Sequence, residues 1–318
     1  MSLRIVSAGR GIPEKCVSND TLSSFIDTND EWIASRTGIS SRYICTDEGL
    51  TDLAATAAQQ ALDAAGVAPT AVGLIICSTM EGDFKTPSLA SGIAERVGTN
   101  CPVFDINAAC SGFVYAMDIA SLYIAHGKAN YILIVCAEMM SKHLDWKDRS
   151  TCVLFGDGAA ACLVTAGNAL RHINLLTAAD VATLNLPAGS GENPFASKRR
   201  PDGFLHMEGQ EVFKFAVSTV INQFQLALTS LNLRAEQVDY FILHQANRRI
   251  IDSIQQKLGQ AKEKFPTNIE RYGNVSSVSI PLLLSEMLDN NMIKCGDILF
   301  MAAFGAGLAA GSCVVVWE

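Results

Sequence analysis

The sequence lacks the segments that carry a protein into or across a membrane. No apolar run reaches about 18 residues, the length that a helix needs to span the lipid core. The first residues, MSLRIVSAGRGIP, contain neither the apolar core nor the cleavage site of a signal peptide. We therefore expect no contact with a membrane and a cytoplasmic location.

Paired cysteines and an excess of basic residues are also missing. None of the ten cysteines forms a Cys-x-x-Cys pair, so no zinc-ligand spacing is present and we expect no metal site. Several cysteines lie in apolar, strand-like runs and are expected to be buried, reduced thiols: Cys77, Cys136, Cys162 and Cys313. The net charge of −8 makes nucleic acid an unfavourable partner.

The residues that are present favour a layered α/β fold. The chain has 318 residues, of which 49% are hydrophobic and 18% charged, a composition that suits a fully buried sheet. Short apolar runs predict strands at Ala71–Cys77, Tyr131–Cys136, Val238–Leu243 and Asp297–Met301. Helices are predicted at Thr51–Gly66, Ser111–Ala125 and Gln210–Leu231. We expect Thr51 to cap the first helix, and the nearly uncharged second helix to be buried on every side.

One motif occurs twice, about half a chain length apart. Residues 155–164 read FGDGAAACLV, and residues 304–314 read FGAGLAAGSCV. Both follow the plan Phe-Gly-x-Gly, small residues, a cysteine and then apolar β-formers. This repeat is either a coincidence of glycine-rich turns or the mark of two similar α/β halves, which we place at residues 1–170 and 171–318.

Cys110 is the first candidate for chemistry. It ends the stretch DINAAC and precedes a predicted helix, where unpaired backbone N–H groups and the helix dipole favour the nucleophilic thiolate. Its small neighbours Ala108, Ala109 and Gly112 leave space for an acyl group. The alternative is an inert structural cysteine, which is the commoner role of this residue.

Two further candidates lie where secondary-structure elements meet. His244 follows the predicted strand VDYFIL, and sites of α/β proteins gather at the carboxyl ends of strands. Asn274 lies in the turn-forming stretch RYGNVSS, where its amide can donate to a substrate oxygen or cap the next helix. A core histidine and a turn-capping asparagine are the alternatives.

The order Cys…His…Asn and the stretches around these residues resemble the β-ketoacyl-acyl carrier protein synthase III family, the initiating condensing enzymes of bacterial fatty-acid synthesis. The resemblance covers nearly the whole chain. The matching stretches are DTNDEWIASRTGI (27–39), FDINAACSGF (104–113), DRSTCVLFGDGA (148–159), MEGQEVFKFAV (207–217), HQANRRI (244–250), RYGN (271–274) and FGAG (304–307).

This resemblance implies a thiolase-like fold, a duplicated five-layer α-β-α-β-α sandwich, with the nucleophile in the first half and the other two residues in the second. Cys110 would take the acyl group from an acyl-CoA. His244 and Asn274 would stabilise the enolate that forms when malonyl-acyl carrier protein loses CO₂. The backbone N–H groups of Cys110 and Ala306 would form the oxyanion hole. Acyl-CoA is then a substrate, no cofactor is expected, and the enzyme is expected to be a homodimer.

Matched positions also imply where the two acyl carriers bind. The residues that would bind CoA are Thr28, Trp32, Arg36, Arg149, Gly209, Phe213, Ala246 and Asn247. Trp32 and Arg149 would hold the adenine between them. Acyl carrier proteins are acidic, as this chain is, so their recognition needs a local basic patch. The candidates for it are Lys214, Arg248, Arg249 and Lys257, for each of which ordinary solvated charge is the alternative.

The sequence departs from the family pattern in a few places. GNVSSVS stands where the family commonly has GNTSAAS, and FGAG replaces an FGGG-like turn. Thr86 stands where many members carry a phenylalanine that narrows the primer pocket, in a loop that reaches the partner subunit. We therefore expect primers longer or bulkier than acetyl to fit.

Other functions remain open on the sequence alone. One is a related condensing enzyme or acyltransferase of secondary metabolism, of the quinolone or polyketide type. Another is a silent partner that only binds acyl carrier protein, although the intact set of Cys110, His244 and Asn274 opposes it. A thiolase is disfavoured, because Cys313 lies in a strand-like run and offers no second catalytic thiol.

Overall fold

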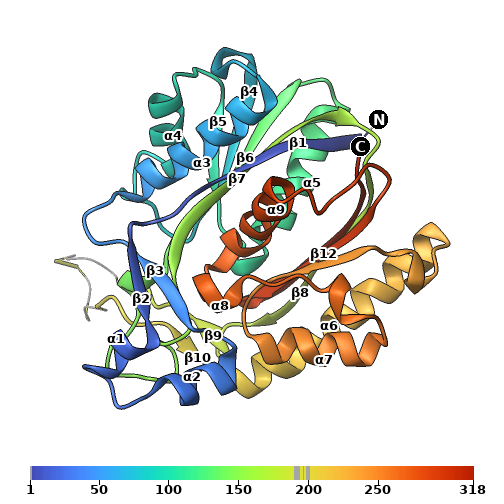
Figure 1. Cartoon of the computed structure of the whole chain (residues 1–318). Helices are drawn as coiled ribbons and strands as arrows, with labels where there is room; N and C mark the ends of the chain where they lie inside the picture. Colours follow the sequence, from blue (N-terminus) through green and yellow to red (C-terminus); the bar gives the residue numbers. More distant parts are fainter. Residues whose placement is uncertain (1, 190–193, 196, 198–200) are drawn as a thin grey trace.

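Strands and helices alternate along the chain and build two separate sheets (Figure 1). The computed structural model describes residues 2–189, 194–195, 197 and 201–318. The first sheet has the strand order β1-β7-β6-β4-β5. Its strands are β1 (Ser2–Gly11), β7 (Asp157–Gly167), β6 (Tyr131–Met139), β4 (Val72–Ser78) and β5 (Val103–Ile106). β7 is antiparallel to both neighbours, whereas β6, β4 and β5 are parallel to one another.

The second sheet repeats this pattern of strand directions. Its order is β8-β13-β12-β11, in which β13 is antiparallel to both neighbours and β12 is parallel to β11. The strands are β8 (Leu170–Asp180), β13 (Gly307–Val316), β12 (Ile298–Gly305) and β11 (Tyr240–Leu243). Both copies of the Phe-Gly-x-Gly motif lead into the second strand of a sheet, β7 or β13, so the motif marks corresponding strands.

Helices cover both sheets and fill the space between them, which gives five layers (Figure 1). α3 (Leu50–Ala65) and α4 (Leu89–Val97) pack on the outer face of the first sheet. α5 (Gly112–Ala125) and α9 (Ser279–Asp289) form the middle layer. α6 (Gly209–Leu231) and α7 (Arg248–Leu258) cover the outer face of the second sheet. The predicted α-β-α-β-α sandwich is thereby confirmed.

The burial of the strands follows from their place in these layers. β6 is buried continuously from Ile132 to Glu138, because helices cover both faces of the sheet at its centre. The four predicted strands are present, and two of them run further toward the site than expected, to Met139 and Gly305. The prediction that the helix at 111–125 is buried on every side is wrong, since Leu122 is 53% exposed.

Smaller elements form a cap beside the two sheets. They are β2 (Lys15–Ser18), α1 (Asn19–Ser23), α2 (Asp30–Thr37), β3 (Ser41–Ile44), β9 (Leu184–Asn185) and β10 (His206–Met207). A separate apolar cluster, which includes Leu22, Ile33 and Leu205, joins these elements. Residues 190–193, 196 and 198–200 of the long loop between β9 and β10 lie outside the described residues. Within the described ranges, no helix is both long and apolar enough to cross a membrane.

The N-terminus of α3 is capped from a distant part of the chain. The helix begins at Leu50, so the prediction that Thr51 caps it is wrong. The carboxylate of Asp83 instead accepts hydrogen bonds from the backbone N–H groups of Leu50 (2.9 Å) and Thr51 (2.8 Å) and from the Thr51 hydroxyl. Partial burial opposes the ionisation of Asp83, but these hydrogen bonds outweigh it and lower its pKa.

Replacing Asp83 by Ala should lower the free energy of unfolding by about 1 kcal/mol, because two N–H groups of α3 lose their acceptor. A lowered pKa means that this contribution is complete above the pKa of an unfolded aspartate and is lost as the pH falls through the folded-state value. Urea denaturation at neutral and acid pH measures both effects. Asp47→Ala, which removes an exposed carboxylate near the same helix, is the control, and an equal loss in both variants would contradict the prediction.

Candidate active site

Cys110 lies in a single 3₁₀ turn, Ala109–Ser111, between β5 and α5. The end of β12 packs directly against this turn. A Cβ atom on Gly305 would lie 2.9 Å from the backbone nitrogen of Cys110 and 3.0 Å from its Cβ, so only glycine permits this approach. The FGAG turn of the second half is thereby held against the thiol of the first half.

The surroundings of the thiol correct two predictions. Burial raises the pKa of Cys110 to about 12, because desolvation outweighs the hydrogen bonds that lower it, so the expected thiolate is not the form of this residue at neutral pH. Gly112 does not leave room for an acyl group either. A Cβ atom there would lie 1.8 Å from the Ser78 hydroxyl, so this glycine allows α5 to pack against β4. Of its small neighbours, only Ala109 lines the cavity described below.

His244 follows β11 directly, and its backbone N–H donates to the carbonyl of Ala302 on β12 (2.9 Å). The ring is buried, and this burial lowers its pKa to about 3, so the imidazole is neutral at neutral pH. Its Nδ1 lies 2.6 Å from the hydroxyl of Ser279. That hydroxyl has one proton, which it gives either to Nδ1 or to the carbonyl of Ser276 at 3.0 Å. Donation to Nδ1 leaves the ring proton on Nε2.

Asn274 is held by strand-like pairing with the opposite half of the molecule. Its backbone N–H donates to the carbonyl of Leu154 (2.8 Å), and its carbonyl accepts from Gly156 (3.1 Å). The side-chain oxygen accepts the N–H of Ser276 (2.9 Å). The NH₂ end of this amide is therefore the part that can donate to a ligand.

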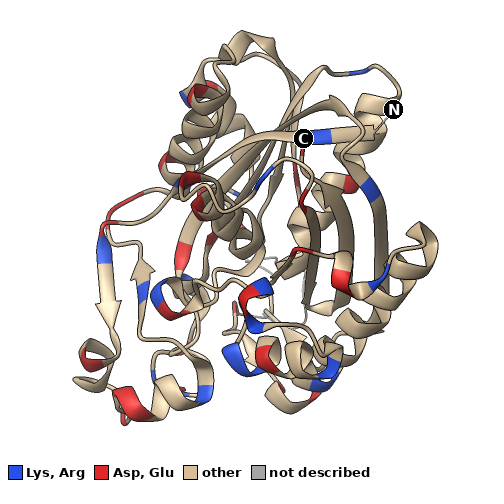
Figure 2. Ribbon diagram, turned by 45° about the vertical axis from the view of Figure 1, so that its right-hand side comes forward, with Lys and Arg blue, Asp and Glu red and all other residues tan. Residues whose placement is uncertain are grey.

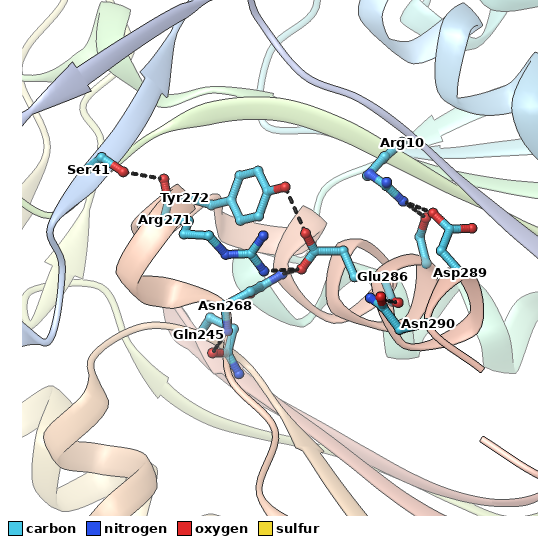
Figure 3. Close-up of polar contacts among 10 residues, drawn as sticks. Arg10, Ser41, Gln245, Asn268, Arg271, Tyr272, Glu286, Asp289 and Asn290 are labelled. Atoms are coloured by element: carbon cyan, nitrogen blue, oxygen red, sulfur yellow. Dashed lines mark hydrogen bonds and ion pairs between the residues drawn. The ribbon is translucent and has the colours of Figure 1, made fainter. Parts of the chain in front are cut away.

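A buried glutamate fixes the segment that leads to Asn274 (Figure 3). Glu286 on α9 accepts hydrogen bonds from the side chains of Asn268 (2.9 Å), Arg271 (2.8 Å) and Tyr272 (2.8 Å). The last two belong to the short helix α8 (Ile269–Tyr272). Asn268 also donates its backbone N–H to Gln245, the neighbour of His244. This network ties both candidate residues of the second half to one helix of the middle layer.

Cys110, His244 and Asn274 converge on one cavity of about 770 Å³. The predicted residues that also line it are Gly209, Phe213, Lys214, Ala246, Asn247, Arg249 and Ala306. Because Lys214 and Arg249 are exposed, the cavity opens at the surface beside α6 and α7. Sequence reasoning did not assign most of the apolar lining: Met80, Met140, Leu154, Phe155, Leu184, Leu205, Met207, Val212, Ile250 and Phe304. Six of these residues lie in stretches that resemble the family, but nothing in the sequence distinguishes them as cavity lining from ordinary core: Leu154, Phe155, Met207, Val212, Ile250 and Phe304.

The predicted adenine-binding residues lie outside this cavity but beside one another. The guanidinium groups of Arg36 and Arg149 lie 4.7 and 5.1 Å from the centre of the Trp32 ring. A base held between Trp32 and Arg149 needs about 7 Å, two van der Waals contacts, so Arg149 must swing away to admit it. Arg149 now donates to the carbonyl of Asp27. The sheltered hydroxyl of Thr28 has no hydrogen-bond partner within the described part of the chain.

The four predicted basic residues differ in whether other side chains already hold them. Arg248 is held by Asp252 (2.9 Å) and Thr267 (3.1 Å), and Lys214 is paired with Glu211 (2.7 Å). Arg249 and Lys257 are exposed on α7, which Asn247 caps by accepting the N–H of Arg249. Figure 2 shows basic and acidic positions interspersed along the ribbon, so any basic surface is local.

Thr86 is exposed and does not line the cavity of its own chain. Any role of Thr86 in the primer pocket therefore requires a second subunit.

Cys313 is fully buried in β13, which removes the thiolase alternative, because that chemistry needs a second accessible thiol.

The thiol of Cys110, the neutral imidazole of His244 and the amide of Asn274 meet at one cavity between the two halves of a five-layer fold. This arrangement places the chain in the class of thiolase-like condensing enzymes. The comparison with known proteins narrows the class. Residues 104–180 match the family described as 3-Oxoacyl-[acyl-carrier-protein (ACP)] synthase III, and residues 228–317 match its C-terminal counterpart. The chain belongs to the 3-oxoacyl-[acyl-carrier-protein] synthase III family.

Individual relatives cover the chain from end to end. Beta-ketoacyl-[acyl-carrier-protein] synthase III of Clostridium acetobutylicum is 40% identical over 99% of both chains, and that of Lactococcus lactis subsp. lactis is 41% identical over 98% of both. The crystal structure of 3-oxoacyl-[acyl-carrier-protein] synthase III from Aquifex aeolicus has a TM-score of 0.92 and 38% identity, covering 99% of this chain and 100% of that chain. The priming β-ketosynthase of the R1128 polyketide pathway is 32% identical, with a TM-score of 0.92, covering 100% and 96%. The two curated synthase III relatives are more similar in sequence to this chain than the polyketide enzyme is, so the secondary-metabolism alternative is not favoured.

Replacing Glu286 by Ala should lower the free energy of unfolding by about 2 kcal/mol, because a buried acceptor with three donors is removed. Chemical denaturation measures the loss. Glu263→Ala, which removes an exposed glutamate in the connection between α7 and α8, is the control. A loss no larger than that of the control would show that the network does not hold this segment.

Proposed function

We propose that the chain catalyses the decarboxylative Claisen condensation of an acyl-CoA primer with malonyl-acyl carrier protein, which initiates fatty-acid synthesis. The observation that carries the proposal is the meeting of Cys110, His244 and Asn274 at one cavity that opens to the surface. The names of the relatives support the same reaction. Both acyl carriers are substrates, no cofactor is invoked, and a cytoplasmic location suits these substrates.

In the first half-reaction the sulfur of Cys110 attacks the thioester carbonyl of the primer and CoA leaves. The developing oxyanion is held by backbone N–H groups of Cys110 and Ala306, which lie on the two elements that Gly305 brings together. The primer reaches the thiol through the cavity, where Phe213 and Ala246 contact the pantetheine arm. Trp32, Arg36, Arg149 and Thr28 hold the nucleotide outside it.

In the second half-reaction the malonyl thioester loses CO₂ while its carbonyl becomes an enolate. The Nε2–H of His244 and the NH₂ of Asn274 donate to that oxygen, which requires the tautomer that Ser279 sets when it donates to Nδ1. The enolate carbon then attacks the acyl group on Cys110 and releases the β-ketoacyl product. Arg249 and Lys257, together with Lys214 and Arg248, offer the basic surface for acyl carrier protein beside the cavity mouth.

The first experiment follows the acyl group. Incubation with acetyl-, isobutyryl-, butyryl- and hexanoyl-CoA should give an adduct whose intact mass matches each accepted acyl group and whose peptide map places it on Cys110. Cys110→Ala should give none. Malonyl-acyl carrier protein should then discharge the adduct as a β-ketoacyl product. Failure of every primer to form an adduct would overturn the proposal.

The two half-reactions should separate in variants. His244→Ala and Asn274→Ala should still be acylated at Cys110, whereas decarboxylation of malonyl-acyl carrier protein should fall by about 100-fold, because each variant loses one donor to the enolate oxygen. Release of CO₂ measures this step. Unchanged decarboxylation in both variants would remove these residues from the mechanism.

We further propose a homodimer in which the loop of Thr86 borders the partner's primer pocket. β5 is a sheet edge that pairs only with β4 within the described residues, and Phe84, two residues before Thr86 in the same loop, is 68% exposed. Light scattering should give twice the chain mass of 34.0 kDa.

Thr86→Phe should lower the rate with hexanoyl-CoA about 10-fold relative to acetyl-CoA, because the larger side chain narrows the pocket. Thr56→Phe, which adds the same side chain on the exposed face of α3, should leave the ratio unchanged. A monomer, or an unchanged ratio in Thr86→Phe, would contradict this placement.

A further inference from the structure

A buried carboxylate beside the nucleophile has no part in the mechanism above. Glu138 lies near the end of β6 and is only 1% exposed. Within the described residues no ion pair with Lys, Arg or His neutralises it. It accepts hydrogen bonds from the Met80 N–H (3.1 Å) and from the hydroxyls of Ser276 (3.2 Å) and Ser277 (2.9 Å). Burying an ionised carboxylate without a neighbouring cation raises the free energy of the folded protein. We therefore expect a function that explains the position of Glu138.

Ser276 connects this carboxylate to the nucleophile. Its hydroxyl lies 3.4 Å from the sulfur of Cys110 and 3.2 Å from Oε1 of Glu138. Ser276 has a φ of 49°, a left-handed conformation that residues other than glycine rarely adopt. The strained backbone turns this side chain into the space between the thiol and the carboxylate.

The direction of this hydrogen-bond chain is fixed by its end. An ionised carboxylate can only accept, so the Ser276 hydroxyl donates to Glu138. The oxygen of that hydroxyl is then free to accept the S–H of Cys110. The contacts therefore run from thiol to hydroxyl to carboxylate, which is the direction in which a proton leaves the sulfur.

We propose that Glu138 is the proton acceptor for Cys110 and acts through the hydroxyl of Ser276. As the sulfur–carbon bond to the acyl group forms, the S–H bond breaks and its proton passes to the oxygen of Ser276. The proton of Ser276 passes at the same time to Oε1 of Glu138, which becomes a neutral carboxylic acid. CoA leaves as a thiolate and takes its proton from solvent. The assignment rests on the proposed function only for the identity of the acyl donor.

The second half-reaction returns the proton. When the enolate carbon attacks the acyl group, Cys110 leaves as a thiolate. Glu138 then donates its proton to Ser276, and Ser276 donates to the sulfur. The thiol and the carboxylate are both restored, and no further acid or base is consumed.

Electrostatic repulsion between a thiolate and an ionised Glu138 favours this route over loss of the proton to water. A thiolate formed with Glu138 still ionised would place two negative charges close together, one of them on a buried carboxylate, and the charge of Glu138 adds to desolvation in raising the pKa of Cys110. Transfer to Glu138 keeps the pair at one negative charge. His244 is a poor acceptor, because burial holds its pKa near 3.

The protonation of Glu138 suits this exchange. Burial raises its pKa to about 7, although the hydrogen bonds from Met80, Ser276 and Ser277 oppose this rise. Among the residues that the structure describes, the charge of Glu138 raises the pKa values of three thiols: Cys110 in the turn before α5, Cys77 on β4 and Cys136 on β6. Burial raises the pKa values of all three, so Glu138 is the group of this cluster that titrates near neutral pH.

Ser277 departs from the common family pattern and adds a contact to Glu138. It stands in GNVSSVS where the family pattern GNTSAAS has alanine, and it gives Glu138 a second hydroxyl donor. Because hydrogen bonds to a carboxylate favour its ionised form, Ser277 keeps Glu138 available as a base at a lower pH than alanine would.

Alkylation of Cys110 by iodoacetamide tests the proposal without any acyl donor. The rate, measured by peptide mass from about pH 5 to pH 9, should rise through an ionisation near 7 in the natural protein. Glu138→Gln should remove this ionisation and slow the reaction about 100-fold at neutral pH. If Glu138 acted only through its charge, Glu138→Gln would instead speed the alkylation, since loss of the negative charge lowers the pKa of the thiol. An unchanged or faster rate in Glu138→Gln would therefore overturn the proposal.

Controls within the same protein keep the result specific. The exposed thiols Cys16 and Cys295 should react at unchanged rates in every variant. Ser276→Ala should slow Cys110 as Glu138→Gln does, because it breaks the chain of hydrogen bonds. Ser277→Ala should keep the ionisation but move it to higher pH. If Glu138→Gln does not fold, these two serine variants decide, and an unchanged pH profile in both would overturn the proposal.

Discussion

The site depends on how closely two backbones approach each other. The end of β12 packs against the turn of Cys110 with no room for a side chain at Gly305, and α5 packs against β4 with no room at Gly112. These contacts join segments that are far apart in the sequence and belong to different layers. Because close-packed interiors transmit small displacements, the distance between the thiol and the FGAG turn is set by the packing of α5 and α9 between the two sheets.

One short segment of the second half then supplies a polar contact to each candidate group of the site. Asn274 presents its amide to the cavity, Ser276 touches the thiol, and Ser279 touches the imidazole. Such a concentration is feasible because Glu286 anchors the preceding helix and pairing with the Leu154–Gly156 strand-like stretch holds the backbone. Buried hydrogen bonds are strong only when every partner is in place, so the anchoring outside the cavity determines the geometry inside it.

The sequence was sufficient to predict the alternation of strands and helices, the repeated Phe-Gly-x-Gly strands and the three candidate residues, because each produces a local pattern. The sequence misled where a residue far away in the chain determines a helix cap or the role of a glycine. Asp83, not Thr51, caps α3, and Ser78 explains Gly112. Burial likewise reverses the expected effect of the helix start on Cys110. Glu138 carries no local signal, since a glutamate at the end of an apolar run looks like a strand terminus until the opposite half is packed against it.

The electrostatics of the site follow from the burial of its polar groups. Burial holds the thiol and the imidazole neutral, with pKa values near 12 and 3, so the cavity resists the creation of any new charge. A condensation in this setting proceeds most easily when charge is moved rather than made. The carboxylate of the malonyl thioester carries a negative charge into the site, and loss of CO₂ only shifts this charge to the enolate oxygen. A carboxylate already buried beside the thiol allows the acylation step to follow the same rule, since the proton and the negative charge merely exchange places.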